Sequence, residues 1–276
     1  MTNSVLQLAH ETGNPAHQLV ILAEGNVSGR DGDTLWIKSS GSSLRTMEEG
    51  DVVALSLPAV LELLASGSAD SIELRSQLNE TRLDLQTSKV PSTEAFMHAA
   101  LVKNDRDRFV VHTHPAKLLP MLFLPDSELV ASRRYFPDEI VLCGAATCWV
   151  PYCMPGLPLA REIQKRQDRF SQRYGVLPNT YWLQNHGLIT TGSSANEALA
   201  ATLMSVKAGS AGRLDFFDLS AETFDGSDEI VDCRRQYAFQ IKGVGSCFLR
   251  DCVFHTFQNP KRFVEVMHGI VSGFDG

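Results

Sequence analysis

Three histidines have the spacing and surroundings of metal ligands. His112 and His114 end a short apolar run, and because successive side chains of a strand alternate between its faces, both imidazoles point the same way. His186 lies in a second apolar stretch, residues 181–192, beside a glycine that permits close backbone approach. Three neutral imidazoles leave one position open on a tetrahedral zinc ion, as a catalytic site requires. An all-nitrogen ligand set favours zinc, with cobalt, nickel and manganese left open.

Glu94 is the candidate general base beside such a metal. Glu94 follows a proline-containing segment that leads into a predicted helix, which continues to about Val102. Ser92 or Thr93 is the predicted N-cap of this helix. Glu94 then lies in the first helical turn, where the helix dipole favours an ionised carboxylate. The competing interpretation is an ordinary helix-start glutamate. His98, four residues later, shares the face of Glu94 and either pairs with it or is simply packed or solvated.

Two loops rich in small residues flank a predicted hairpin. Asp31-Gly32 between two strand-like runs indicates a hairpin turn. The loop Gly25-Asn26-Val27-Ser28 precedes it, and the loop Ser39-Ser40-Gly41-Ser42-Ser43 follows it. Backbone N–H groups near glycine and serine hydroxyls donate hydrogen bonds to anions, so the loops are a candidate phosphate site. Two ordinary turns are the alternative.

The remaining pattern predicts alternating helices and strands. Helices are expected on both sides of a break near residues 13–15, with the second over 16–23, and further helices at 116–120, 159–174 and 194–213. Residues 58–66 and 71–80 are expected to be short helices or loops. Strands are expected at 52–57, 140–143, 147–150, 181–192 and, as a pair, within 240–253. Residues 125–137 are expected to be a polar loop, and the tail to hold an acidic loop and a helix from residue 260.

Composition narrows the class of protein. A length of 276 residues with 43% apolar residues predicts one domain with an ample core, spanning 1–276. The net charge of −7 argues against nucleic-acid binding. The sequence contains no run of about 18 apolar residues, so we expect no membrane-spanning helix. We expect a cytoplasmic protein, because the start of the chain lacks a signal-peptide pattern and the six cysteines form no C-x-x-C pair.

Five motifs together resemble the class II aldolase/adducin family, in order and in rough spacing over about residues 20–210. The motifs are Gly25-Asn26-Val27-Ser28, Ser39-Ser40-Gly41, Pro91-Ser92-Thr93-Glu94, His112-Thr113-His114-Pro115 and Asn185-His186-Gly187. The family includes L-fuculose-phosphate and L-rhamnulose-phosphate aldolases and L-ribulose-phosphate 4-epimerase. The chain looks closest to the aldolase half of proteins that fuse this domain to a short-chain dehydrogenase.

The resemblance implies a three-layer α/β/α sandwich with a largely antiparallel sheet, often a homotetramer. It implies zinc held by His112, His114 and His186, with Glu94 as the acid–base residue. In the family's epimerases an aspartate usually stands there, so a glutamate favours carbon–carbon cleavage. The family's phosphate pocket maps onto Gly25, Asn26, Ser40, Gly41, Ser92 and Thr93.

The expected function is therefore a zinc-dependent lyase of carbohydrate metabolism. It would cleave a small sugar phosphate or related hydroxy-carbonyl compound reversibly, through a metal-stabilised enediolate. A metal-dependent decarboxylase of a 3-oxo or hydroxylated acid would share the same ligands, and a non-catalytic adducin-like assembly module is the third reading.

Three departures from the family leave the substrate open. Lys38 precedes the second loop where the phosphate aldolases commonly have threonine, and the tail after residue 213 does not follow the aldolases. The second proton donor has no clear match, with Tyr135, Asp138 and Glu139 as candidates.

Overall fold

A computed structural model describes residues 1–66, 71–124, 127–135, 137–217, 238–241 and 245–248. The chain divides into two compact units, residues 1–210 and 211–276. In the second unit, β8 (Ala238–Ile241) pairs antiparallel with β9 (Gly245–Phe248). These strands overlap the pair predicted within 240–253, whereas the predicted acidic loop and terminal helix lie outside the described residues.

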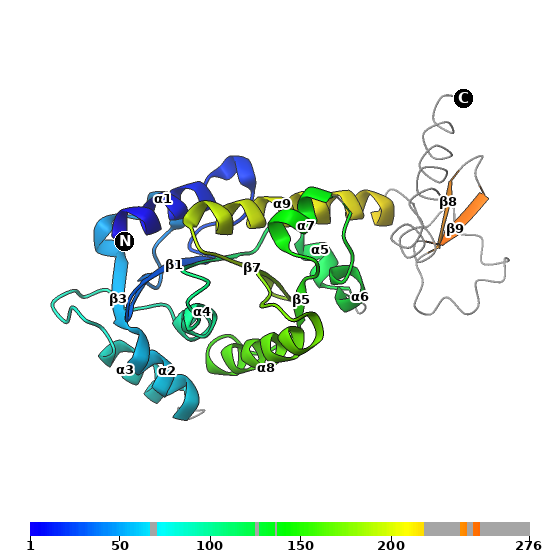
Figure 1. The fold of residues 1–276 in the computed structure, drawn as a ribbon. Coiled ribbons are helices and arrows are strands. Elements are labelled where there is room, and N and C mark those ends of the chain that lie inside the picture. The colour runs from blue at the N-terminus through cyan, green and yellow to red at the C-terminus, as the bar shows by residue number, and fades with distance from the viewer. Residues whose placement is uncertain (67–70, 125–126, 136, 218–237, 242–244, 249–276) are drawn as a thin grey trace. The chain divides into compact units, whose positions relative to one another are not determined.

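A seven-stranded sheet in the order β3-β2-β1-β4-β7-β6-β5 forms the centre of the first unit (Figure 1). Its strands are β1 (Asn26–Asp31), β2 (Thr34–Lys38), β3 (Val52–Ser56), β4 (Phe109–Thr113), β5 (Cys148–Val150), β6 (Thr180–Leu183) and β7 (Gly187–Gly192). Only β5 and β6 pair in parallel, so the sheet is mostly antiparallel, as expected. The predicted hairpin is confirmed, because Asp31 of β1 faces Thr34 of β2 across a two-residue turn.

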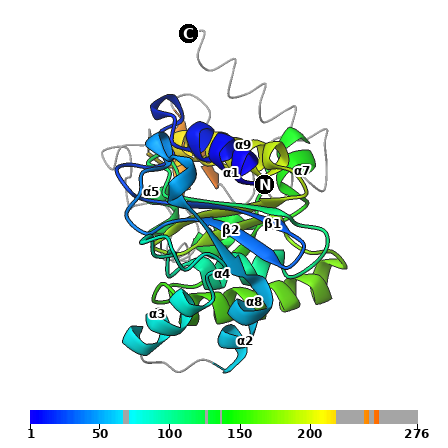
Figure 2. The same cartoon turned by 90° about the vertical axis from the view of Figure 1, so that its left-hand side faces the viewer.

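Helices cover both faces of this sheet. In two perpendicular views, α1 (Thr2–Thr12) and α9 (Ala195–Phe217) lie on one side (Figures 1 and 2). On the other side lie α2 (Leu57–Ser66), α3 (Ser71–Glu80), α4 (Ala95–Val102) and α8 (Leu157–Tyr174). The short helices are α5 (Leu119–Leu122), α6 (Ser127–Ala131) and α7 (Pro137–Cys143), with 3-10 turns at Pro15–His17, Leu44–Thr46 and Glu49–Asp51.

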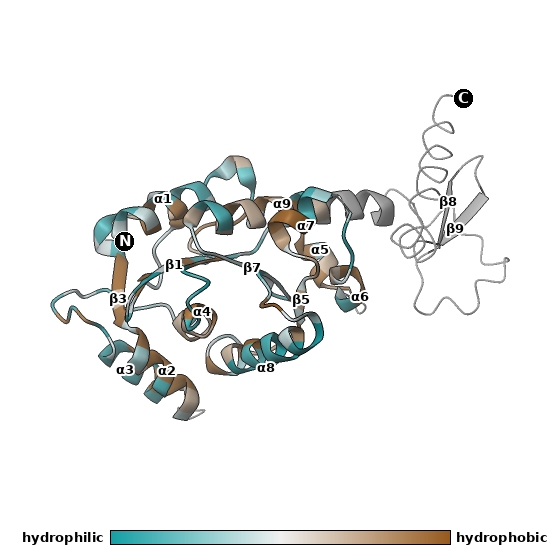
Figure 3. Ribbon diagram, viewed as in Figure 1, coloured by the Kyte–Doolittle hydropathy of each residue, from teal (hydrophilic) through white to brown (hydrophobic). Residues whose placement is uncertain are grey.

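Helix α4 is the most deeply buried helix described. Every residue of its sequence AFMHAALV is buried, because α2 and α8 pack against it on the side away from the sheet. Helix α8, by contrast, is largely hydrophilic and buries only one stripe (Figure 3). The start of α4 is therefore held rigidly at the sheet, and this start carries Glu94. Among the described residues, no helix combines the length and the apolar composition that a bilayer crossing requires.

Several predicted elements differ in the structure. No α-helix forms over residues 16–23, because Gln18 and Leu22 adopt left-handed backbone angles (φ 53° and 51°) that a right-handed helix excludes. The stretch 140–143 is helical rather than a strand, since Pro137 and two acidic residues give α7 the start signals of a helix. Pro120 lies in the first turn of α5 instead of ending a helix, and α6 occupies part of the predicted loop.

The predicted single strand 181–192 was also wrong. It is two strands, β6 and β7, joined by a turn in which Asn185 is left-handed (φ 54°). Asparagine tolerates that conformation better than most residues. His186 therefore lies in a turn at the end of the sheet, not in the middle of a strand.

Candidate metal centre

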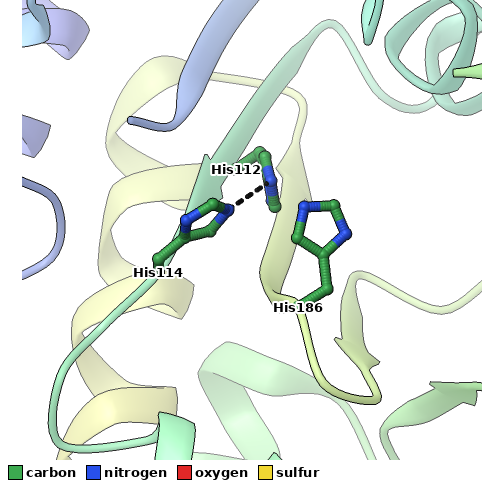
Figure 4. Close-up of side chains that lie close together, drawn as sticks. All are labelled: His112, His114 and His186. Atoms are coloured by element: carbon green, nitrogen blue, oxygen red, sulfur yellow. Dashed lines mark hydrogen bonds between the residues drawn. The ribbon is translucent and has the colours of Figure 1, made fainter. Parts of the chain in front are cut away.

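The three predicted histidines meet at one end of the sheet (Figure 4). His112 and His114 come from the end of β4, and His186 comes from the β6–β7 turn. Their ring centroids lie 4.9–5.1 Å apart, and one nitrogen from each ring lies within 4.8 Å of the others. The Nε2 atoms of His112 and His114 are 3.1 Å apart. Strand β4 pairs with β7 in the register Thr113 to Leu188, which places the turn beside the two histidines.

Gly187 makes this convergence possible. A Cβ at this position would lie 2.4 Å from Thr113 O, 2.8 Å from His114 Cδ2 and 3.2 Å from His112 Cε1. No other residue fits there without moving the backbone of β4 or the imidazole rings. The close approach predicted for this glycine is thus a contact with the histidine rings themselves.

Glu94 points at the same place from the start of α4. Its Oε1 atom lies 3.6 Å from His112 Nε2 and 3.5 Å from His186 Nε2. Glu94 is itself the N-cap residue of α4, one or two residues later than the predicted Ser92 or Thr93, and its backbone N–H donates to Ser92 Oγ. The predicted proximity of this carboxylate to the histidines is therefore present.

Asn26 holds the Glu94 carboxylate in place. Its Nδ2 donates a short hydrogen bond to Glu94 Oε2, and its backbone pairs with His112 across β1 and β4. One residue of β1 thus spaces the carboxylate relative to a histidine of β4. Sequence reasoning assigned Asn26 to phosphate binding only and gave no signal for this contact, because it joins residues 68 positions apart.

Burial and the carboxylate fix the charges of these groups. Burial lowers the pKa of His112 to about 3, and burial together with His186 lowers the pKa of His114. These imidazoles are therefore neutral at pH 7, which is the form that binds metals. Burial by itself raises the pKa of Glu94, but His112 and a hydrogen bond from His186 outweigh it and hold that pKa well below its usual range.

The donor set fits a divalent transition metal. His112 Nδ1 lies 3.0 Å from Leu188 O, and because a carbonyl only accepts, the proton of the neutral ring is on Nδ1 and the lone pair is on Nε2. That lone pair and Glu94 Oε1 face each other, an arrangement of acceptors that a cation stabilises. A tetrahedral zinc with bonds of about 2.0–2.1 Å spaces its ligand atoms about 3.3 Å apart. The Nε2 atoms of His112 and His114, 3.1 Å apart, are close to that spacing, and one nitrogen from each of the three rings lies within 4.8 Å of the others.

The predicted anion-binding residues come from three adjacent segments. The backbone N–H of Ser40 donates to Val90 O (2.8 Å), which brings the loop after β2 against the segment that holds Ser92 and Thr93. Lys38 is 2% exposed, and its Nζ donates to Ala23 O (3.3 Å) and Ser42 O (2.8 Å). This ammonium group thereby joins the loop after β2 to the loop before β1. Gly25 and Gly41 are left-handed (φ 71° and 81°), as glycine permits.

Glu139, one of the candidate second proton donors, has a structural role. Glu139 and Arg134 form a buried ion pair with both side chains 4% exposed, and Glu139 also accepts the backbone N–H of Tyr135. A separate cavity of about 400 Å³ lies along β2 and β3, and none of the predicted site residues lines it.

Glu24 had no predicted role, yet its carboxylate lies beside His114.

His98 does not bond to the carboxylate of Glu94. Its Nδ1 instead pairs with Ser28 Oγ at 2.7 Å, and its Nε2 is buried without a hydrogen-bond partner. Asn26 and Ser28 share one face of β1, and Glu94 and His98 are one turn apart on α4, so two side-chain bonds fasten the start of α4 to β1. Burial lowers the pKa of His98 to about 4.

We expect the metal-free protein to lose stability as the pH falls from about 6.5 to about 4. Over that range the unfolded chain binds protons at His98 and His112 and the folded chain does not, so protons favour unfolding. Each histidine contributes a slope of up to about 1.4 kcal/mol per pH unit. Urea unfolding in the presence of a chelator, across this pH range, measures the slope. His98→Gln should reduce it by about one proton, and equal slopes would contradict a neutral buried His98.

Comparison with known sequences gives a matching family model and a distant relative. The sequence model of the family "Class II Aldolase and Adducin N-terminal domain" matches residues 5–209. An uncharacterized oxidoreductase, YuxG of Bacillus subtilis (strain 168), is 26% identical over 184 residues, which are 65% of this chain. The match covers 24% of that relative, so this chain corresponds to about a quarter of its length.

Solved structures share the fold. The N-terminal class II aldolase domain of a conserved protein from Thermoplasma acidophilum matches with a TM-score of 0.59 and 21% identity, over 76% of this chain and 92% of that one. An L-fuculose-1-phosphate aldolase from Thermus thermophilus matches with a TM-score of 0.55 and 14% identity, over 79% and 96% of the two chains. At these identities the likeness concerns the fold alone.

Proposed function

This chain belongs to the class II aldolase and adducin N-terminal domain family, and on that premise we propose that it is a metal-dependent lyase. The proposed reaction is reversible aldol cleavage of a small sugar phosphate or a related hydroxy-carbonyl compound. The proposed ligands of the cation, zinc in the first place, are His112, His114 and His186.

One observation carries the proposal: three imidazoles and an ionised carboxylate converge on one point. An assembly module has no use for this arrangement, because it places neutral imidazoles and a carboxylate together at a cost in desolvation. A catalytic cation site needs them, with one side left for the substrate. The family match by itself leaves both readings open.

Each group at the site has a separate role in the proposed reaction. A bound divalent cation would act as a Lewis acid toward negative charge that develops on substrate oxygens. Glu94 removes and returns the proton on the nucleophilic carbon, since its low pKa keeps it ionised and its Oε1 faces the histidines. Asn26 fixes the orientation of that carboxylate through Oε2. Burial lowers the pKa of His112 and of His114, so these two imidazoles stay in the neutral form that binds a metal.

The anionic end of the substrate is proposed to bind at the small-residue loops. The N–H and O–H donors would come from Gly25, Asn26, Ser40, Gly41, Ser92 and Thr93, and the buried Lys38 would add positive charge.

We also propose that the chain has the family's three-layer α/β/α sandwich, forms a homotetramer and is located in the cytoplasm. We further propose that residues 1–276 form one family domain, with a less family-like C-terminal extension that begins at about residue 214.

A product assay on the metal-loaded protein tests this function. Purified protein is analysed for bound metal, then incubated with a panel of sugar phosphates and hydroxy acids, while released aldehyde and released carbon dioxide are measured separately. We expect close to one zinc per chain and aldehyde release. Carbon dioxide release would favour a decarboxylase with the same ligands, and less than about a tenth of a metal ion per chain after zinc supplementation would favour the assembly module.

A further inference from the structure

His114 differs from the other two histidines in what lies behind its ring. His112 Nδ1 lies 3.0 Å from Leu188 O, and His186 Nδ1 is buried without a hydrogen-bond partner. His114 Nδ1 instead lies 3.8 Å from Glu24 Oε1. The opposite nitrogen of that ring, Nε2, faces His112 Nε2. Glu24 therefore stands on the outer side of the His114 ring, away from the point where the imidazoles meet.

A closed turn fixes the position of Glu24. Its backbone N–H donates to Ile21 O (3.0 Å), and the backbone N–H of Ile21 donates to Glu24 Oε2 (3.1 Å). The neighbouring Ala23 O accepts from the buried ammonium of Lys38, and Gly25 is left-handed with no room for a Cβ against His112 O. One carboxylate oxygen is thus held by the backbone, and the other faces His114.

We propose that Glu24 is the positioning residue of His114. Its carboxylate accepts the Nδ1 proton, holds the ring in the Nδ1–H tautomer and presents the Nε2 lone pair to the cation. The proposal rests on the proposed function, since a cation bound by the histidines is its premise. Outer carboxylates of this kind orient metal-bound histidines and raise their basicity.

The distance and the charges both agree with this role. The distance of 3.8 Å between Glu24 Oε1 and His114 Nδ1 is longer than a hydrogen bond, and among the described residues no hydrogen-bond partner lies closer to this nitrogen. A cation held on Nε2 would polarise the ring and strengthen donation from Nδ1, and we expect this to draw Glu24 and His114 together. Glu24 and Glu94 together carry two negative charges on either side of neutral imidazoles, which balances a divalent cation.

Competition with a chelator measures the zinc affinity that Glu24 controls. Glu24→Gln keeps the size of the side chain but loses its charge, and we expect about 10- to 100-fold weaker zinc binding. Glu24→Asp keeps the charge but shortens the reach, so it should also bind zinc several-fold more weakly. The matched control is Glu11→Gln, because Glu11 Oε2 lies 3.9 Å from His17 Nε2 in a comparable pair outside the site. The control should change affinity by less than about twofold.

A spectroscopic readout separates positioning from long-range charge. In the zinc-loaded wild type, ¹⁵N-histidine NMR should show a downfield Nδ1–H proton for His114, and this signal should move upfield in Glu24→Gln. Circular dichroism of the metal-free variants checks that each is folded. An unmoved His114 signal would contradict the hydrogen bond to Glu24.

The outcomes distinguish the two proposals. A wild-type protein that binds no divalent cation overturns the proposed function and this inference together. Wild-type binding with equal affinity in Glu24→Gln overturns the inference and leaves the proposed function standing. Full affinity in Glu24→Asp with a loss in Glu24→Gln means that charge acts without positioning, which also overturns it.

Discussion

Glu94→Gln should retain bound zinc and lose turnover by about 10²- to 10⁴-fold, the usual contribution of a positioned general base. The amide keeps the shape of the side chain and an oxygen for Asn26, so the histidines and the start of α4 keep their places. It cannot take up the substrate proton. Steady-state kinetics with the substrate found in the product screen, together with metal analysis of the same preparation, measures both effects.

Glu197→Gln is the matched control for this prediction. Glu197 lies near the start of a helix, as Glu94 does, but its carboxylate accepts from the N–H and the hydroxyl of Ser193. It sits at the Phe109 end of β4, since Gly192 beside it pairs with Phe109. Its replacement should lower stability slightly and leave turnover unchanged. Wild-type turnover in Glu94→Gln would remove this carboxylate from the mechanism.

Gly187→Ala should damage both folding and metal binding. The added methyl would overlap Thr113 O and the rings of His114 and His112, so β4, β7 or the rings must shift. Overpacking of this kind costs about 1–3 kcal/mol, and more when backbone atoms form the obstacle. A displacement of the imidazoles should also weaken zinc binding at least about tenfold. Urea unfolding of the metal-free protein and chelator competition measure the two losses.

Gly50→Ala controls for the loss of a glycine. A Cβ at Gly50 would meet no atom within 4 Å, and its backbone is not left-handed. We expect stability within about 0.5 kcal/mol of the wild type and unchanged zinc affinity. If Gly187→Ala behaves like Gly50→Ala, then the β6–β7 turn does not set the spacing of the histidines.

The identity of the site residues was accessible from the sequence because it depends on local patterns. Two histidines two residues apart in extended chain share a face, and the ring centroids of His112, in β4, and His114, one residue beyond its end, lie 4.9 Å apart. The Asp-Gly turn and the helix that begins beside Glu94 follow from local backbone preferences as well. The boundary between β6 and β7 could not be predicted in the same way. Both strands are buried on both faces of the sheet, so the apolar run through residues 181–192 has no periodicity that marks the turn between them.

The sequence alone determined which residue types gather and which family pattern they follow, because strand alternation, turn chemistry and helix starts act over a few residues. Only the tertiary structure decided how the groups are oriented. Asn26 on Glu94, Glu24 behind His114 and Gly187 against the rings are contacts between segments far apart in the chain. Such contacts depend on strand register and helix packing, since a shift of one residue in β1 or β7 would turn these side chains away from the site.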